Sequence, residues 1–378
     1  MDVPELGSLK VEEGQADALK KRRLTVDIDV HIHEKAEELA EYSEMPWKRA
    51  LLAIKDVPER YLDIPGLSPS TPDEGVDPPF PGGQPLRFVR SAAQMRSELD
   101  DLGIDAGIIF PDHLLKIALF PNVDYAMALA RAYNRWLAGN CIDKDRKLYG
   151  AICVAPQDPS GSAEEITKMR GDGNFIAIYL PVAGLQRLYG HREYDPIYEV
   201  AEKYGLPLVL HSVSAIHSVF PFQLEQYPNA FARHALAHPL AMIANLIHMI
   251  STGVPVRFPK LKVVFAEGAI SWVPWVMMRL DKEYLERRRE VPFLEERPSH
   301  YIRRFCYGTQ PIEEPERASD YVKLVELMGG PESILFSSDW PHHDFDHPRK
   351  ILSYPMPEEW KDKIMGENAA RIFNLNGS

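Results

Sequence analysis

Short runs of aliphatic and β-branched residues alternate along the chain with longer stretches whose apolar positions recur every three or four residues. The short runs predict strands, and the longer stretches predict amphipathic helices. We expect strands at residues 24–32, 104–110, 147–154, 174–180, 206–211, 261–266, 302–307 and 333–338. We expect helices at residues 91–102, 123–142, 160–171, 193–204, 229–252, 270–290, 315–329 and 358–373.

The regular alternation of eight strands with eight helices predicts an α/β fold, a (β/α)8 TIM barrel. An open doubly wound sheet is the alternative, but no GxGxxG motif follows the first predicted strand. We expect residues 24–378 to form one barrel domain and residues 1–23 to form an N-terminal leader. The length of 378 residues is compatible with one such domain, because barrels of this class often exceed ~250 residues.

Two segments interrupt the alternation. Residues 34–90 are rich in proline and have no clean hydrophobic period, which is unusual for an ordinary connection. An insertion after the first strand of a barrel lies over the carboxyl ends of the strands, so we expect this segment to cover the site and define specificity. A second insertion, residues 213–228, is apolar and aromatic. We expect it to wall a pocket or to meet a partner subunit.

Composition narrows the choice of partners and compartment. The formal net charge of -12 disfavours a nucleic-acid partner, because phosphate binding needs a basic face. The three cysteines form no CxxC pair, which is typical of a reducing compartment. The polar N-terminus does not resemble a signal peptide, and no stretch approaches the ~20 apolar residues that cross a bilayer. We therefore expect a cytoplasmic protein without a membrane partner.

The candidate chemistry lies at the ends of the predicted strands. The stretch VDIDVHIHE, residues 26–34, ends a buried strand in His31 and His33, which point to the same side because strand residues alternate. The fifth, sixth and eighth strands end in His211, Glu267 and Asp339. Functional side chains of a barrel gather at the carboxyl ends of its strands, and imidazole with carboxylate suits zinc, iron and manganese. These strand ends therefore predict a divalent metal site.

The motifs around these strand ends occur in a recognisable order: DVHIH, VLHS, RFPKLKVVFAEGAISWVPWVMMRLD and ILFSSDWPH, followed by ENAARIFNL. On these motifs the chain resembles the amidohydrolase-related family, in the branch typified by aminocarboxymuconate semialdehyde decarboxylase. The resemblance implies a metal-dependent barrel whose metal ligands are His31, His33, His211 and Asp339. The chain departs from that branch at Glu267, where the branch has a histidine. The departure counts against a simple decarboxylation, and Glu267 becomes a candidate ligand or base.

More ligand-type side chains stand near the strand ends than one metal ion needs. The surplus allows a dinuclear centre in which Glu267 or Asp339 bridges two ions. His342 follows the eighth strand and is a candidate for polarising the substrate. The further candidates for a second metal ion or for substrate contact are Asp29, His238 and His343.

The leading hypothesis is a metal-dependent hydrolase or lyase that uses a metal-activated water on a small organic acid or amide. The reaction would be hydrolysis or C–C cleavage such as decarboxylation. Asp339 is the candidate base, Glu267 is a second acid or base, and His342 is the polarising group. Zinc is the metal expected for a hydrolase.

Two alternatives use the same ligand frame. The first is a dinuclear iron or manganese/iron oxygenase that hydroxylates a small substrate such as an amino acid, as some relatives in the family do. The second is a non-catalytic subunit that pairs with a related, active barrel. We also expect a homo- or hetero-oligomer, because long aromatic insertions are often subunit contacts. One zinc ion per chain would support the hydrolase, whereas two redox metals with oxygen uptake would support the oxygenase.

Overall fold

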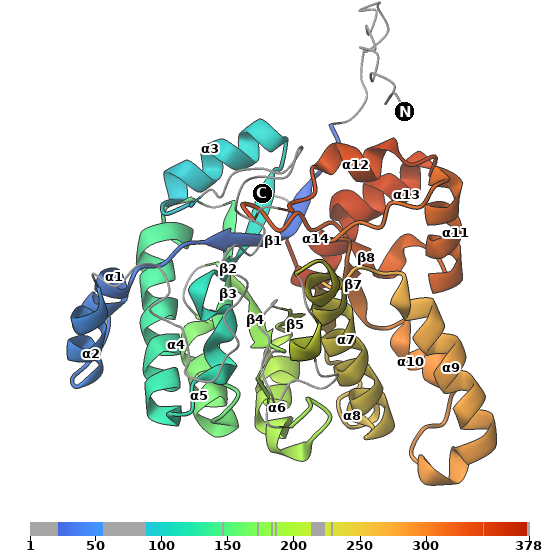
Figure 1. Cartoon of the computed structure of the whole chain (residues 1–378), viewed down its shortest axis with the longest axis horizontal. Coiled ribbons are helices and arrows are strands. Elements are labelled where there is room, and N and C mark those ends of the chain that lie inside the picture. Colours follow the sequence, from blue (N-terminus) through green and yellow to red (C-terminus); the bar gives the residue numbers. More distant parts are fainter. Residues whose placement is uncertain are drawn as a thin grey trace, which may run out of the picture.

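A parallel sheet of eight strands, hydrogen-bonded in chain order from β1 to β8, forms the centre of the computed structural model (Figure 1). The strands are β1 (Val26–Ile32), β2 (Ala106–Pro111), β3 (Leu148–Cys153), β4 (Phe175–Pro181), β5 (Leu208–His211), β6 (Val263–Ala266), β7 (Cys306–Gly308) and β8 (Ile334–Leu335). Each strand lies at its predicted place in the order, and each strand except β7 begins within two residues of its predicted start. The predicted (β/α)8 barrel is therefore confirmed. The structure describes residues 22–55, 88–145, 147–171, 174–182, 184–185, 187–212, 224–227, 230–342 and 344–375.

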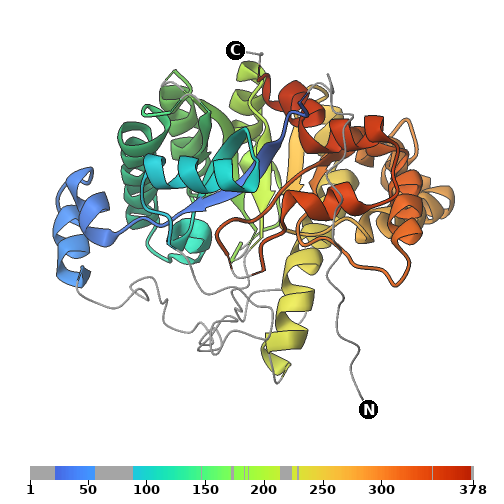
Figure 2. The same ribbon diagram turned by 90° about the horizontal axis from the view of Figure 1, so that it is seen from above.

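Helices surround the strands, as Figure 2 shows from above. Those that match predicted helices are α3 (Ala92–Leu102), α4 (Val123–Leu137), α5 (Pro159–Met169), α6 (Asp195–Tyr204), α7 (Ala230–Ser251), α9 (Trp272–Arg287), α11 (Ala318–Met328), α13 (Glu358–Asp362) and α14 (Asn368–Phe373). The ends follow ordinary capping chemistry. Ser91 accepts a hydrogen bond from the backbone N–H of Gln94 at the start of α3, and Gly205 ends α6 with a φ of 69°.

Several short helices were not predicted, because their apolar positions cover too few turns to show a period. They are α1 (Ala36–Glu41), α2 (Trp47–Ile54), α8 (Val254–Arg257), α10 (Pro298–Ile302) and α12 (Pro348–Ser353). α1 and α2 lie in the predicted insertion 34–90 and pack beside each other, and α1 also packs against α4. Residues 1–21, 56–87 and 213–223 lie outside the described residues, so the predicted leader, cover and pocket wall stay predictions.

None of the helices in the part of the chain that the structure describes combines the length and the apolar composition needed to cross a lipid bilayer.

The barrel closes between β1 and the segment that follows β8. The backbone N–H of His31 donates to the carbonyl of Trp340 at 2.7 Å, and the N–H of Asp339 donates to the carbonyl of Asp29 at 3.0 Å. Val30 and Trp340 also form a parallel bridge. This closure brings residues that are about 310 positions apart in sequence to the same end of the barrel, where parallel strands of a TIM barrel carry their functional side chains.

Asp27 strengthens the same seam from inside the barrel. Its fully buried carboxylate accepts hydrogen bonds from the backbone N–H groups of Asp29 and Ser338, each at 3.0 Å, and from the Ser338 hydroxyl. Burial disfavours the charged form and raises the pKa of Asp27 to about 8, although these hydrogen bonds oppose the rise. The Ser338 hydroxyl accepts in turn from the N–H of Trp340 at 3.1 Å. Asp27 therefore connects β1 to the segment that carries Asp339.

We expect Asp27→Ala to lower the free energy of unfolding by about 3 kcal/mol, because two buried N–H donors lose their acceptor. Urea unfolding followed by circular dichroism measures the change. Asp100→Ala is the matched control: this carboxylate is largely exposed beside Arg96, and such a surface pair contributes less than about 1 kcal/mol. Equal losses in the two variants would contradict a role for Asp27 in closing the barrel.

Candidate metal centre

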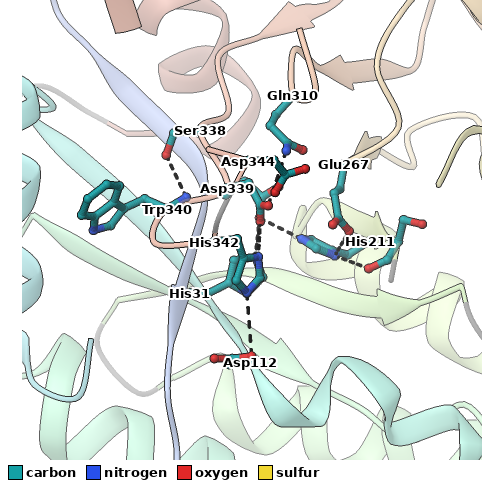
Figure 3. A network of polar contacts seen from close by, with 12 residues as sticks. His31, Asp112, His211, Glu267, Gln310, Ser338, Asp339, Trp340, His342 and Asp344 are labelled. Carbon is teal, nitrogen blue, oxygen red and sulfur yellow. Dashed lines mark hydrogen bonds and ion pairs between the residues drawn. The ribbon is translucent and has the colours of Figure 1, made fainter. Parts of the chain in front are cut away.

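Four buried side chains converge at the carboxyl ends of the strands: Asp29, His31, His211 and Asp339 (Figure 3 shows all but the first by label). One ligand atom from each lies within 4.8 Å of the others. His31 Nε2 lies 3.1 Å from an oxygen of Asp29 and 3.1 Å from an oxygen of Asp339. His211 Nε2 lies 2.8 Å from the same Asp29 oxygen. Strands β1 and β5 and the segment after β8 thus supply one compact donor set.

Backbone carbonyls orient both imidazoles of this set. Nδ1 of His31 donates to the carbonyl of Pro111 at 2.8 Å, and Nδ1 of His211 donates to the carbonyl of Ser212 at 2.7 Å. A neutral imidazole that carries its proton on Nδ1 directs the lone pair of Nε2 at whatever lies opposite. This is the tautomer in which histidine binds a metal ion through Nε2, with its other nitrogen held by an acceptor.

The arrangement fits a divalent cation. With neutral imidazoles, the Nε2 lone pairs of His31 and His211 face carboxylate oxygens, which also carry only lone pairs. Nε2 of His31 and Oδ2 of Asp29 are buried without a hydrogen-bond partner among the described residues. A buried polar atom without a partner is costly, and a cation bound by all four groups would satisfy these atoms. Two imidazoles with two carboxylates suit zinc, iron or manganese.

The pKa shifts of His31 and Asp29 also indicate that this group favours positive charge. Burial and the neighbouring His342 oppose protonation of His31, yet Asp29 and Asp339 raise its pKa to about 10. Burial also opposes ionisation of Asp29, yet His211 and His31 lower the pKa of that carboxyl. The buried carboxylates therefore require positive charge beside them, which a bound metal ion would provide.

Two strand ends hold their carboxylates on unusual backbone. Asp339 has a φ of 63° and Glu267 has a φ of 57°, in the left-handed region that residues other than glycine rarely adopt. Such strain persists where the surrounding structure over-determines it, and it is concentrated at functional sites. The backbone bond from Asp339 to Asp29 is part of what holds the first of these turns.

The structure places His33 outside the four-residue group. β1 ends at Ile32, and His33 lies with its Nδ1 2.7 Å from an oxygen of Asp112 and its Nε2 3.1 Å from Nε2 of His113. Asp29, predicted only for a second metal or for substrate contact, lies in the group instead. Asp29, His31 and His33 share one face of an ideal strand, so the alternation placed Asp29 near the group without separating it from His33.

Glu267 lies behind the metal group, between two histidines. One of its oxygens is 3.3 Å from Nδ1 of His211, and the other is 3.4 Å from Nδ1 of His238. Figure 3 shows the carboxylate directed at the His211 ring. The described geometry thus pairs Glu267 with imidazoles, and the ligand atoms of the four-residue group do not include it.

His342 joins the group from the side. Its Nδ1 lies 2.7 Å from an oxygen of Asp339, and its ring stacks on that of His31 with centroids 4.3 Å apart. Its Nε2 lies 3.7 Å from an oxygen of Asp112. Burial lowers the pKa of His342, but Asp339 and Asp112 raise it well above its usual value. The predicted candidate His343 lies outside the described residues.

Sequence reasoning assigned no role to Asp112 and did not consider Gln310. Asp112 contacts both His33 and His342, and it directly follows β2 at its carboxyl end. That position at a strand end was the available signal. Gln310 lies two residues after β7, with its Nε2 3.4 Å from an oxygen of Asp339. An isolated amide carries no comparable signal in sequence.

Comparisons with known proteins find relatives in sequence and in fold. The chain is 24% identical over 287 residues to the gamma-resorcylate decarboxylase of Rhizobium sp. (strain MTP-10005), which covers 69% of this chain and 81% of that protein. The solved 5-carboxyvanillate decarboxylase from Sphingomonas paucimobilis matches with a TM-score of 0.69 and 22% identity, over 93% of this chain and 99% of that chain.

A solved dihydroxybenzoic acid decarboxylase from Polaromonas sp. JS666, with bound manganese and the inhibitor 2-nitroresorcinol, matches with a TM-score of 0.64 and 17% identity, over 94% of this chain and 98% of that chain. At these identities the structural likeness shows the fold. The family model described as amidohydrolase matches residues 112–375, which is more than half of the chain. The resemblance drawn from the strand-end motifs is therefore confirmed, and the chain belongs to the amidohydrolase family.

Proposed function

We propose that the protein is a metal-dependent lyase that removes the carboxyl group of a hydroxylated aromatic acid as CO2. The observation that carries the proposal is the buried group of Asp29, His31, His211 and Asp339 at the mouth of the barrel. The substrate class comes from the curated relatives, because gamma-resorcylate decarboxylases match over about four fifths of their own length. The named relatives give no support to an oxygenase or to a non-catalytic subunit.

One divalent ion would be held by Nε2 of His31 and His211 and by the carboxylates of Asp29 and Asp339. When bound, the ion supplies positive charge that orients the substrate oxygens and stabilises negative charge on them. We propose manganese rather than the zinc expected for a hydrolase, since a solved neighbour contains manganese. We also propose a mononuclear centre, because one such group of ligand atoms occurs within the described residues.

The overall reaction replaces a carboxylate by hydrogen. A proton adds to the ring carbon that bears the carboxylate, the C–C bond then breaks, and its electron pair restores the aromatic ring as CO2 leaves. A hydroxyl group next to that carbon makes it basic enough to accept the proton. One proton is consumed in each turnover, so the site needs an acid beside the substrate.

We assign that proton to the pair formed by Asp339 and His342. The two side chains share a hydrogen bond of 2.7 Å, and the stacking of His342 on His31 keeps its ring next to the metal group. Asp112 faces the opposite nitrogen of His342 and holds the ring in this orientation. Among the described residues Glu267 faces Nδ1 of His211 and Nδ1 of His238 rather than this pair, so its presence leaves the proton donor in place.

We expect the manganese-loaded protein to release one CO2 for each molecule of 2,6-dihydroxybenzoate or 5-carboxyvanillate consumed. In D2O the product should carry one deuterium at the carbon that lost the carboxylate, because the entering proton comes from exchangeable groups. Mass spectrometry and NMR of the product measure both outcomes. Failure to release CO2 from either acid, together with hydrolysis of an amide substrate, would contradict the proposal.

The two histidines of the HIH motif should differ in their effect on metal content. We expect about one divalent ion per chain in the native protein, and its loss in His31→Ala, which removes a direct ligand. His33→Ala should keep the ion, because the ring nitrogens of His33 face Asp112 and His113. Plasma mass spectrometry after dialysis measures the ion. Equal losses in the two variants would restore His33 as a ligand.

We expect His342→Asn to lower kcat by about 10²- to 10⁴-fold, the usual contribution of a positioned acid, with the metal content unchanged. His300→Asn is the matched control, because this histidine is exposed on α10. Steady-state kinetics of CO2 release measure the change. If kcat of His342→Asn equalled that of the control, the proton would have to come from another group.

A further inference from the structure

Helix α7 brings a buried imidazole to the edge of the metal group. His238 is 3% exposed, its Nδ1 meets only the carboxylate of Glu267 at 3.4 Å, and its Nε2 has no hydrogen-bond partner among the described residues. A buried polar group without a hydrogen bond is costly, so native structures leave one only where a ligand, an ion or water completes it. Its location beside a candidate active site indicates that the missing partner is a bound molecule.

Glu267 fixes the direction of this imidazole. Its Oε1 lies 3.4 Å from Nδ1 of His238, while its Oε2 lies 3.3 Å from Nδ1 of the metal-group residue His211. The carboxylate is itself buried and sits on left-handed backbone, with a φ of 57°. Because Nδ1 of His238 faces Glu267, Nε2 is the nitrogen left for a ligand.

Three carboxylates act on the charge of His238. Burial lowers the pKa of His238, but Glu267, Asp344 and Asp339 together raise it above its usual value. Asp339 belongs to the metal group, and the geometric link between His238 and that group is Glu267, whose other oxygen faces His211. His234, one turn earlier on α7, continues the same face, with its ring centroid 4.7 Å from that of His238.

We propose that His238 contacts the substrate directly, with Nε2 hydrogen-bonded to an oxygen substituent of the aromatic acid, and that Glu267 is the positioning residue for this contact. The inference rests on the proposed function, since it assigns a subsite to the same reaction. It makes α7 a specificity element: an acid with an oxygen atom opposite His238 satisfies the buried imidazole, and an acid without one leaves it unpaired.

The direct test uses histidine labelled with ¹⁵N in the zinc-loaded full-length protein, since zinc is diamagnetic. The probes are 2,6-dihydroxybenzoate and 2-nitroresorcinol, and the resonances of His238 are assigned by their loss in His238→Gln. We expect saturating probe to shift the Nε2 resonance of His238 while the resonances of the exposed His300 stay in place. No shift of the His238 resonance with either probe, including failure of both to bind, would overturn the inference.

Steady-state kinetics distinguish a substrate contact of His238 from a purely structural role. His238→Phe removes the hydrogen bond but keeps a flat ring, and we expect it to raise KM for 2,6-dihydroxybenzoate about 10-fold, with a smaller change in kcat and an unchanged metal content. His238→Gln offers an amide to the same oxygen and should recover part of the loss. Glu267→Gln should have a smaller effect than His238→Phe. An unchanged KM in His238→Phe would contradict the contact.

The two proposals fail in different ways. If the protein releases no CO2 but a probe still shifts the His238 resonance, the reaction is wrong and the subsite stands. If CO2 is released and the resonance does not shift, the reaction stands and the subsite is wrong.

Discussion

The site depends on the closure of the barrel between β1 and the segment after β8. The backbone hydrogen bonds that join Asp29 to Asp339 and His31 to Trp340 are the last contacts of the parallel sheet, and they also set the spacing of the donor atoms. A sheet that stayed open at this edge would separate the carboxylate of Asp339 from the β1 ligands. Asp27 holds the same edge together from within the barrel. The same contacts therefore contribute to the stability of the fold and to the geometry of the site.

Closure of the barrel sets the positions of the donor atoms, and it also buries negative charge that must be balanced. It places two carboxylates, Asp29 and Asp339, in a fully buried environment around the ring of His31. Buried charges are costly unless they are paired, and in neutral imidazoles that donate from Nδ1 to these backbone carbonyls the Nε2 atoms meet the carboxylates without protons. A divalent ion relieves all of these costs at once. The preference of this group for positive charge, from a metal ion or from a proton on His31, therefore follows from the fold.

Much of this could be predicted from the sequence, because the signals were strong where strands are long and buried. The alternation of elements predicted the barrel, and the residues at strand ends predicted a site of His31, His211 and Asp339, which do lie together in one buried group. The distinction between Asp29 and His33 could not be predicted, since both lie on the same face of an ideal strand as His31. It depends on where β1 stops pairing, and β1 ends at Ile32, after which His33 meets Asp112. Contacts between segments far apart, such as Asp112 with His342, leave no periodic trace in sequence.

Three carboxylate–imidazole pairs surround the metal group: Asp339 with His342, Asp112 with His33, and Glu267 with His238. In each pair the carboxylate engages Nδ1, which orients the ring. Local arrangement matters more here than the net charge of -12, which by itself would repel an organic acid. Acidic side chains near the mouth of the barrel lie beside imidazoles, and they raise the pKa values of His342 and His238. The carboxylates therefore favour positive charge, from imidazole or from a metal ion, at the place where the proposed anionic substrate would bind.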